Sequence, residues 1–251
     1  MIEIKDLSFS YGKKEVLSNV SLSFEKGSIT TIIGPNGCGK TTLLNSVAGI
    51  IRQSKNTIFI DGKDSALMKR KERARKTAYL MQGKSIPDMT VESLILHGRF
   101  PYTSLGGTYS EEDRKAAVEA MKKTSVSHLA KRNISTLSGG MRQNVFIAMA
   151  LSQGSDYILM DEPTTFLDIS KQAELIRLLR SLAKDKKGIV SVLHDLPLAL
   201  TLSDSIVLMA DGRVIMQDTP QKIHESGLIN KIFNAEIKKV YGNEEYYYTF
   251  R

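Results

Sequence analysis

Residues Gly34 to Thr41 read Gly-Pro-Asn-Gly-Cys-Gly-Lys-Thr and match the phosphate-binding pattern G-x-x-x-x-G-K-[ST] at every fixed position. Glycines allow the backbone to curl so that its N–H groups point at phosphate oxygens. Lys40 can place a positive charge at the β- and γ-phosphates, and the Thr41 hydroxyl can bind Mg²⁺. An apolar strand pattern at residues 29–33 precedes the loop and a helical pattern at residues 42–48 follows it. This context favours nucleotide binding over a glycine-rich turn without a ligand.

A pair of acids, Asp161 and Glu162, follows the apolar strand pattern of residues 157–160. Asp161 can hold Mg²⁺ directly or through water, and Glu162 can polarise an attacking water as a general base. The alternative is two acids in a surface loop, but the preceding strand is too apolar for a surface edge. The pair therefore indicates a nucleoside triphosphatase.

Two further polar side chains, Gln82 and His194, each follow an expected buried strand, at residues 77–81 and 188–193. In a parallel α/β sheet the carboxyl ends of the strands form the ligand side, where Asp161 also lies. His194 could hydrogen-bond a γ-phosphate. The alternative for Gln82 is an exposed loop amide, and the alternative for His194 is a structural histidine. The sequence patterns alone do not choose between a functional and a structural role for either residue.

Ser138-Gly139-Gly140 precedes a helix expected over residues 144–152, and it predicts a second helix start that favours anions. A serine N-cap with two loop glycines would give the same letters. Tyr11 lies in the turn expected at residues 11–14, where it could be a surface residue or could stack on an adenine ring. Sequence patterns do not decide between these alternatives.

The elements that must position these residues predict an α/β fold. We expect a P-loop NTPase core with a mostly parallel sheet, an N-terminal antiparallel β-subdomain and an inserted helical subdomain. The chain would form a single domain over residues 1–251, with its core at about 1–83 and 156–251 and the helical insert at about 84–155. Smaller elements are also expected: a strand at residues 56–63 that ends in an Asp-Gly turn, a helix from Ser110 with acids in its first turn, a helix at about 170–183, a hairpin at 206–216, a short helix near Pro220, and a terminal strand or docking segment at 240–251.

The composition fits a soluble globular protein, with 251 residues, 41% hydrophobic and 25% charged. No apolar run is long enough to cross a bilayer, and the N-terminus lacks the features of a signal peptide. The single cysteine, Cys38, favours a reducing cytoplasm. The net charge is +8, but the densest basic run, residues 69–76, contains no aromatic residue for base stacking. We interpret this run as one exposed face of a short helix, and we expect no nucleic-acid partner.

Taken together and in this order, the phosphate loop, Gln82, Leu137-Ser138-Gly139-Gly140, the acid pair and His194 resemble the ATP-binding subunit of ATP-binding cassette (ABC) transporters. The resemblance covers essentially the whole chain, and Leu-Ser-Gly-Gly is its most specific motif. A finer similarity is to the ATPases of iron–siderophore, haem and cobalamin importers. It rests on His97 to Tyr102, Ser110 to Arg114, His128 to Ala130, Ser135 to Gly140 and His194 to Leu196.

The resemblance implies specific roles for residues that match the family's motifs. Tyr11 would stack on adenine, and Gln82 would contact Mg²⁺ or the attacking water and sense the membrane subunits. Asp161 would support Mg²⁺, Glu162 would be the catalytic base and His194 would contact the γ-phosphate. The phosphates would be held by Asn36, Gly37, Cys38, Gly39, Lys40, Thr41 and Thr42.

The resemblance also implies partners. Two copies would pair head to tail, with Ser138, Gly139 and Gly140 of one copy closing on ATP held by the other and Asp168 at the contact. Membrane permease subunits and an external substrate-binding protein would complete an importer at the cytoplasmic face of the membrane. A soluble ATPase of iron–sulfur cluster assembly is the alternative.

Some features remain open at this stage. Met141 and Phe166 depart from the family pattern. A thioether is a poor hydrogen-bond acceptor, so a ribose contact by Met141 is an open question. The effect of Phe166 on the shape of the contact between two copies is also open. The transported cargo and the role of the tyrosine-rich tail are also open.

Overall fold

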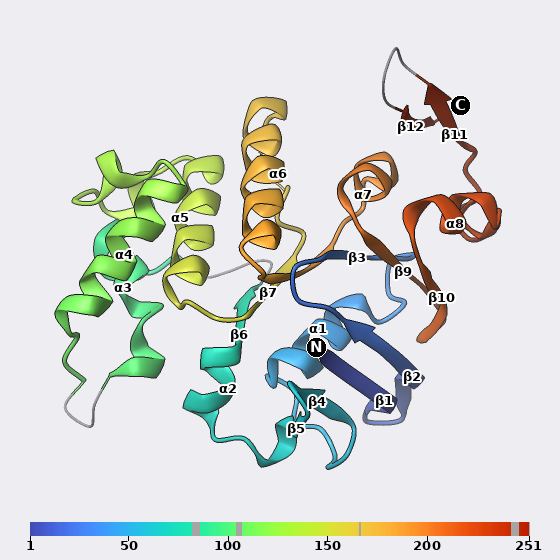
Figure 1. Cartoon of the computed structure of the whole chain (residues 1–251), viewed down its shortest axis with the longest axis horizontal. Coiled ribbons are helices and arrows are strands. Elements are labelled where there is room, and N and C mark those ends of the chain that lie inside the picture. The colour runs from blue at the N-terminus through green and yellow to red at the C-terminus, as the bar shows by residue number, and fades with distance from the viewer. Residues whose placement is uncertain (82–85, 104–106, 166, 242–245, 251) are drawn as a thin grey trace.

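A computed structural model describes residues 1–81, 86–103, 107–165, 167–241 and 246–250. Its centre is a six-stranded sheet with the order β10-β9-β3-β8-β7-β6, in which only the β9–β10 pair is antiparallel (Figure 1). The strands are β3 (Ile29–Ile33), β6 (Thr77–Leu80), β7 (Tyr157–Asp161), β8 (Gly188–Val192), β9 (Ser205–Ala210) and β10 (Arg213–Asp218). Every residue of β3, β7 and β8 is buried, as expected for strands covered on both faces. The prediction of a mostly parallel α/β core is therefore confirmed.

The N-terminal antiparallel sheet has the order β2-β1-β4-β5. It is built from β1 (Ile2–Tyr11), β2 (Lys14–Phe24), β4 (Ile58–Ile60) and β5 (Lys63–Asp64). The tight turn after Tyr11 is where the sequence predicts it. The strand expected within residues 56–63 is β4, and the Asp-Gly turn expected at its end is present, because the chain reverses at Asp61 and Gly62, which both have positive φ. The sequence did not predict the short strand β5, which pairs with β4 after this turn.

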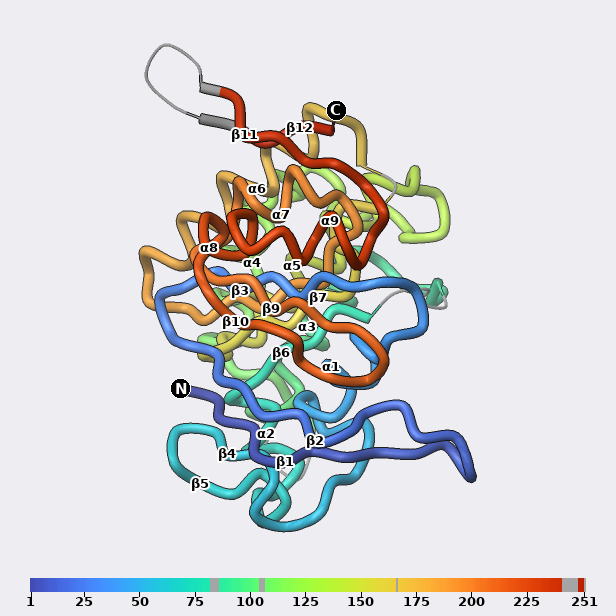
Figure 2. The backbone as a smooth tube through the Cα atoms, turned by 90° about the vertical axis from the view of Figure 1, so that its right-hand side faces the viewer, coloured from blue at the N-terminus to red at the C-terminus, as the bar shows by residue number. Residues whose placement is uncertain are grey.

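Two hydrophobic cores lie on opposite faces of the central sheet. Ile32 of β3 packs with residues of β1, β2 and α1 (Lys40–Ala48), whereas Ile29 and Ile33 pack with α6 (Ile169–Lys184) and α7 (Leu196–Leu202). Figures 1 and 2 show α6 and α7 above the sheet and the N-terminal strands below it. Because successive side chains of a strand point to opposite faces of the sheet, β3 contributes residues to both hydrophobic cores. Helix α8 (Pro220–Glu225) lies where the sequence predicts a short helix. The short helices α7 and α9 (Leu228–Phe233) were not predicted from the sequence.

Between β6 and β7 the chain forms a helical block. Its helices are α3 (Val91–His97), η2 (Phe100–Tyr102), α4 (Glu111–Lys123), η3 (Ser127–Leu129), η4 (Ile134–Thr136) and α5 (Gly139–Ser152). Ser110 and Asp113 form a reciprocal capping box at the start of α4. Helices α3, α4 and α5 pack on one another (Figure 1). The expected start of α5 at Asn144 is wrong by five residues, because Ser138 caps the helix by accepting from the Met141 N–H at 3.4 Å.

The basic run of residues 69–76 forms α2 (Arg70–Lys76), which follows the short η1 (Ser65–Leu67). Its cations are not simply solvated. Lys71 Nζ donates to the Thr103 carbonyl at 2.7 Å, Arg73 donates to the Gly49 carbonyl at 3.0 Å, and Arg75 donates to the Pro101 carbonyl. These contacts join α2 to the end of α1 and to the helical block, so the interpretation of the run as a solvated face is incomplete.

The tyrosine-rich tail forms a hairpin of β11 (Ile237–Tyr241) and β12 (Tyr246–Phe250). Strand β12 of the hairpin lies against α7, and Ile237 and Tyr248 are buried. Figure 2 shows the backbone of the hairpin at the top of the molecule. Of the two alternatives for this tail, the structure has the terminal strand. Within the described ranges, no helix combines the length and apolar character that a membrane span needs.

Candidate active site

The phosphate loop connects β3 to α1 at the carboxyl end of the central sheet. A Cβ at Gly34 would lie 2.4 Å from the Met209 carbonyl oxygen, so the loop can pass β9 only with glycine there. Gly39 caps α1 with φ +101°, a conformation that favours glycine. The Lys40 ammonium is buried and donates to the carbonyls of Gly34 at 2.7 Å and Pro35 at 2.9 Å. The cation is therefore held inside the loop, at the N-terminus of α1 where anions are favoured.

Asp161, at the end of β7, faces this loop. Its carboxylate is 2% exposed, and no donor in the described part of the chain completes a hydrogen bond with either oxygen. Burial raises the pKa of Asp161; the Thr41 hydroxyl and the Lys40 charge oppose this rise, and the charge of Glu162 adds to it. The buried Asp161 carboxylate completes no hydrogen bond with the described residues and lies near the Thr41 hydroxyl, and together they offer hard oxygen ligands that fit Mg²⁺.

A cation here would need further ligands. Within the described residues, no group of three or more His, Cys, Asp or Glu side chains could hold a metal by itself. Mg²⁺ commonly binds through one or two protein oxygens together with waters and phosphate oxygens. The residues present fit that kind of site, with Asp161 and Thr41 as the protein's share.

Glu162 lies next to Asp161 and adopts a left-handed backbone with φ +52°. Its N–H donates to the Val192 carbonyl of β8 at 3.2 Å, and its Oε2 accepts from the Thr165 hydroxyl at 3.2 Å. Its Oε1 makes a short contact with His194 Nε2, and the His194 side chain is about half exposed. The structure thus brings together two side chains that follow neighbouring parallel strands. A carboxylate held on one side by an imidazole can accept a proton from water.

The other residues expected around the phosphates occupy varied environments. Asn36, Gly37 and Thr41 are exposed, whereas Gly39 and Thr42 are buried. Cys38 is 6% exposed, and burial raises the pKa of its thiol despite the nearby Lys40 charge. The Gly39 backbone approaches Val16 and Leu17 of β2, so the β1–β2 hairpin borders the loop.

Tyr11 lies at the tip of this hairpin. Its side chain is 55% exposed, and its ring meets Phe9 edge to face with centroids 4.9 Å apart. An exposed ring, supported from one side at the border of the phosphate loop, can present a free face to a flat ligand such as adenine.

The start of α5 is formed by Ser138, which is exposed, and by Gly139 and Gly140, which are half-buried; it lies in the helical block rather than beside the phosphate loop (Figure 1). These residues line a groove of about 570 Å³ that Asp168 and Lys171, at the start of α6, also line. The structure therefore places Ser138, Gly139 and Gly140 in the same groove as Asp168. It does not bring them to the loop of the same chain. Met141 lies in this groove and packs partly against the core.

Two residues singled out from the sequence, Gln82 and Phe166, lie outside the described residues. Two others were missed. Thr165 contacts the Glu162 carboxylate, and Gln143 of α5 donates from Nε2 to the Pro163 carbonyl at 2.9 Å. No sequence pattern indicated Gln143, because its partner lies 20 residues away in a different element. Thr165 follows Glu162 by three residues, a spacing that allows a local turn contact.

Comparison with known proteins places this geometry in a family. The model of the ABC transporter family matches residues 17–165. The ferric enterobactin transport ATP-binding protein FepC of Escherichia coli K12 is 38% identical over 231 residues, which cover 91% of this chain and 85% of that protein. A metal-chelate type ABC transporter solved in an inward-facing conformation has a TM-score of 0.85 at 25% identity, covering 100% of this chain and 96% of that chain.

A second solved structure is a dimeric ATP-binding cassette in a post-hydrolysis state with ADP and phosphate. It has a TM-score of 0.77 at 28% identity, covering 88% of this chain and 99% of that chain. The matched family region includes the phosphate loop, the Ser-Gly-Gly helix start and the acid pair, and it spans more than half of the chain. The chain therefore belongs to the ABC transporter family.

Proposed function

We propose that this chain is the ATP-hydrolysing subunit of an importer for a ferric siderophore or a related metal chelate. The observation that carries the hydrolytic role is the contact between Glu162 and His194 beside the buried Asp161 and the phosphate loop. The cargo class is supported by relatives, one of which transports ferric enterobactin and another of which is a metal-chelate type transporter.

Each residue contributes a separate function in this proposal. Lys40 and the N–H groups of the phosphate loop bind the β- and γ-phosphates, and Tyr11 stacks on the adenine. Asp161 and Thr41, with Gln82, hold Mg²⁺, which when bound neutralises phosphate charge. Glu162 accepts the proton of the attacking water, and His194 orients Glu162 and contacts the γ-phosphate.

A second copy of the chain completes the site. Ser138, Gly139 and Gly140 line a groove away from their own phosphate loop, so their N–H groups at the start of α5 can serve a nucleotide held by another copy. The dimeric form of a structural relative supports this pairing. Hydrolysis would then follow closure of the two copies on ATP, a ligand-driven shift between two states.

Replacement of the base tests the hydrolytic role. Glu162→Gln keeps the shape of the side chain but cannot accept a proton, so ATP turnover should fall by roughly 10²- to 10⁴-fold while ATP binding remains. ATP should then trap a dimer, detectable by size-exclusion chromatography with light scattering. Glu119→Gln, on the exposed face of α4, is the matched control and should turn over ATP normally. Normal turnover by Glu162→Gln would refute the assignment.

The importer role requires membrane subunits, which we place at the cytoplasmic face of the membrane together with this chain, and an external substrate-binding protein. Tagged full-length chain expressed in its own host should co-purify with polytopic membrane proteins in detergent. Recovery with soluble iron–sulfur scaffold proteins instead would support the alternative function and refute import.

A further inference from the structure

A hydrogen bond connects the first turns of α5, the helix that begins after Ser138, to the loop that follows Glu162. Gln143 Nε2 donates to the Pro163 carbonyl at 2.9 Å across a partly buried contact. Gln143 lies five residues after Ser138 in the same continuous helix, and Pro163 directly follows Glu162. This contact thus joins, within one chain, the helix that begins after Ser138 to the loop that follows Glu162.

The receiving end of this bond is a backbone that needs support. Glu162 has φ +52° and precedes a proline, a combination that steric contacts disfavour. Pro163 is buried and has no N–H, so its carbonyl is the only hydrogen-bonding group of that residue. A donor to this carbonyl therefore fixes the peptide next to the base, while Val192 fixes the Glu162 N–H from the other side.

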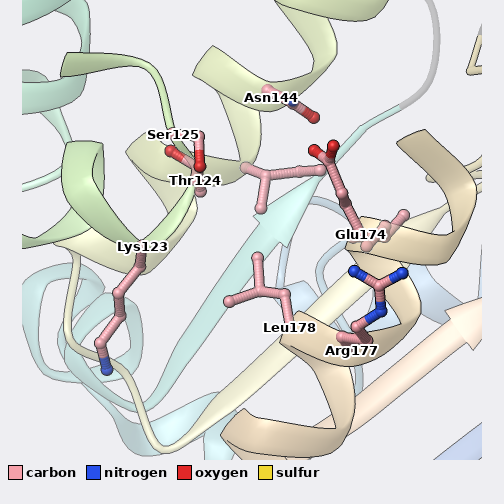
Figure 3. A pocket seen from close by; sticks show the side chains of 9 residues that line it. Lys123, Thr124, Ser125, Asn144, Glu174, Arg177 and Leu178 are labelled. Carbon is pink, nitrogen blue, oxygen red and sulfur yellow. The ribbon is translucent and has the colours of Figure 1, made fainter. Parts of the chain in front are cut away.

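The donor end belongs to an element that can transmit a displacement. An α-helix moves as a rigid body over its first turns because its backbone hydrogen bonds are internal. Helix α5 is not packed closely against α6 along its whole length: a cavity of about 310 Å³ lies between them, lined by Asn144 of α5 and by Glu174, Arg177 and Leu178 of α6 (Figure 3). The groove at Ser138 opens beside it. Contact of a nucleotide with the start of α5 can therefore shift Gln143 relative to the core.

We propose that Gln143 is a positioning residue that couples engagement of Ser138 to Gly140 by the partner copy's nucleotide to the placement of Glu162 in its own chain. The inference rests on the proposed function, since it requires a nucleotide shared between two copies. Each copy would thereby sense that it has closed on its partner's ATP and would orient its own base, which links the two sites of a dimer.

Two full-length copies joined by a flexible linker test this directly, because Gln143 and Glu162 can be changed in chosen copies. The reference carries Glu162→Gln in one copy, so the other copy supplies the only working base. Adding Gln143→Leu to the copy with the working base should lower the ATP turnover number about tenfold, with KM for ATP changed less than twofold. Adding it instead to the copy that already carries Glu162→Gln should leave turnover within twofold of the reference.

The two linked dimers contain the same substitutions, so a folding defect would slow both and cannot mimic the expected difference. Gln143→Lys in the copy with the working base keeps a donor and should recover most of the turnover. Gln221→Leu, on the exposed α8, is a chemically matched control and should have no effect.

Equal rates in the two arrangements would overturn the inference. The reverse order would also overturn it, because Gln143 would then act through the partner's nucleotide instead of through Glu162. If the reference itself fails to hydrolyse ATP, the proposed function fails together with the inference, and this outcome is distinct from either of the other two.

Discussion

Replacement of Asp161 by asparagine tests two effects of this buried carboxylate. The carboxylate lowers the folding stability of the protein without ligand, and it strengthens the binding of Mg²⁺ and nucleotide. Both oxygens of Asp161 are buried without hydrogen-bond donors in the described part of the chain, and burial raises its pKa. A buried polar group left unpaired costs about 1–3 kcal/mol of folding free energy. Asparagine removes the charge but keeps polar atoms, so we expect the free energy of unfolding to rise by about 1 kcal/mol, near the lower end of this range. For a chain of this size that gain raises the midpoint of thermal unfolding by roughly 2–4 °C.

The stabilising effect of the Asp161 carboxylate appears only when Mg²⁺ and nucleotide are present. A ligand at 100 times its Kd stabilises a protein by about 2.7 kcal/mol. Wild-type protein should therefore gain several degrees when EDTA is replaced by Mg²⁺-ATP. Asp161→Asn should lose most of that gain, because an amide oxygen is a weaker magnesium ligand than a carboxylate, and its ATPase activity should fall with it. Thermal unfolding followed by intrinsic tyrosine fluorescence in both buffers measures the two effects.

Asp156 provides a matched control at the opposite end of the same strand. It accepts hydrogen bonds from Lys26 and Lys76 at 3.0 and 2.9 Å, and its side chain is about one-third exposed. Asp156→Asn should therefore lower the midpoint, by the equivalent of less than about 1 kcal/mol, and leave the response to Mg²⁺-ATP intact. A lower midpoint for Asp161→Asn in EDTA, or a full response of that variant to Mg²⁺-ATP, would refute the reasoning.

Two further predictions use pKa shifts. Burial alone would raise the pKa of Asp61, but Lys76 and Lys26 hold it well below its ordinary value, so its contribution to stability is complete above about pH 4 and is lost as pH falls further. Urea midpoints measured from pH 7 to pH 3 should fall less steeply in Lys76→Met, and an unchanged slope would contradict this. Burial also raises the pKa of Cys38, so iodoacetamide should modify it roughly tenfold or more slowly than a free cysteine, with further protection by Mg²⁺-ATP. Equal rates with and without nucleotide would argue against its place beside the phosphates.

The positions of several candidate site residues could be predicted from the sequence. The loop that ends at Lys40 follows β3, Asp161 is the last residue of β7, and His194 lies two residues after β8; the carboxyl ends of these parallel strands share one edge of the sheet. The start of α5 was placed five residues late, because two glycines resemble a loop and only the Ser138 cap shows that they are helical. The bond from Gln143 to Pro163 was out of reach for a similar reason: it depends on how α5 packs against the core, which periodicity does not encode.

The backbone of Glu162 explains why that packing matters for catalysis. A residue with φ +52° before proline is not held there by its own preference, so neighbouring groups must hold it. Those neighbours come from three elements: the Val192 carbonyl of β8, the Thr165 side chain of the following turn, and Gln143 of α5 acting on the next peptide. The first two belong to β8 and to the turn after Glu162, but the third belongs to the helix that begins directly after Ser138. The orientation of Glu162 therefore depends in part on the position of α5, and under the proposed mechanism hydrolysis stays slow until a partner's nucleotide has fixed that helix.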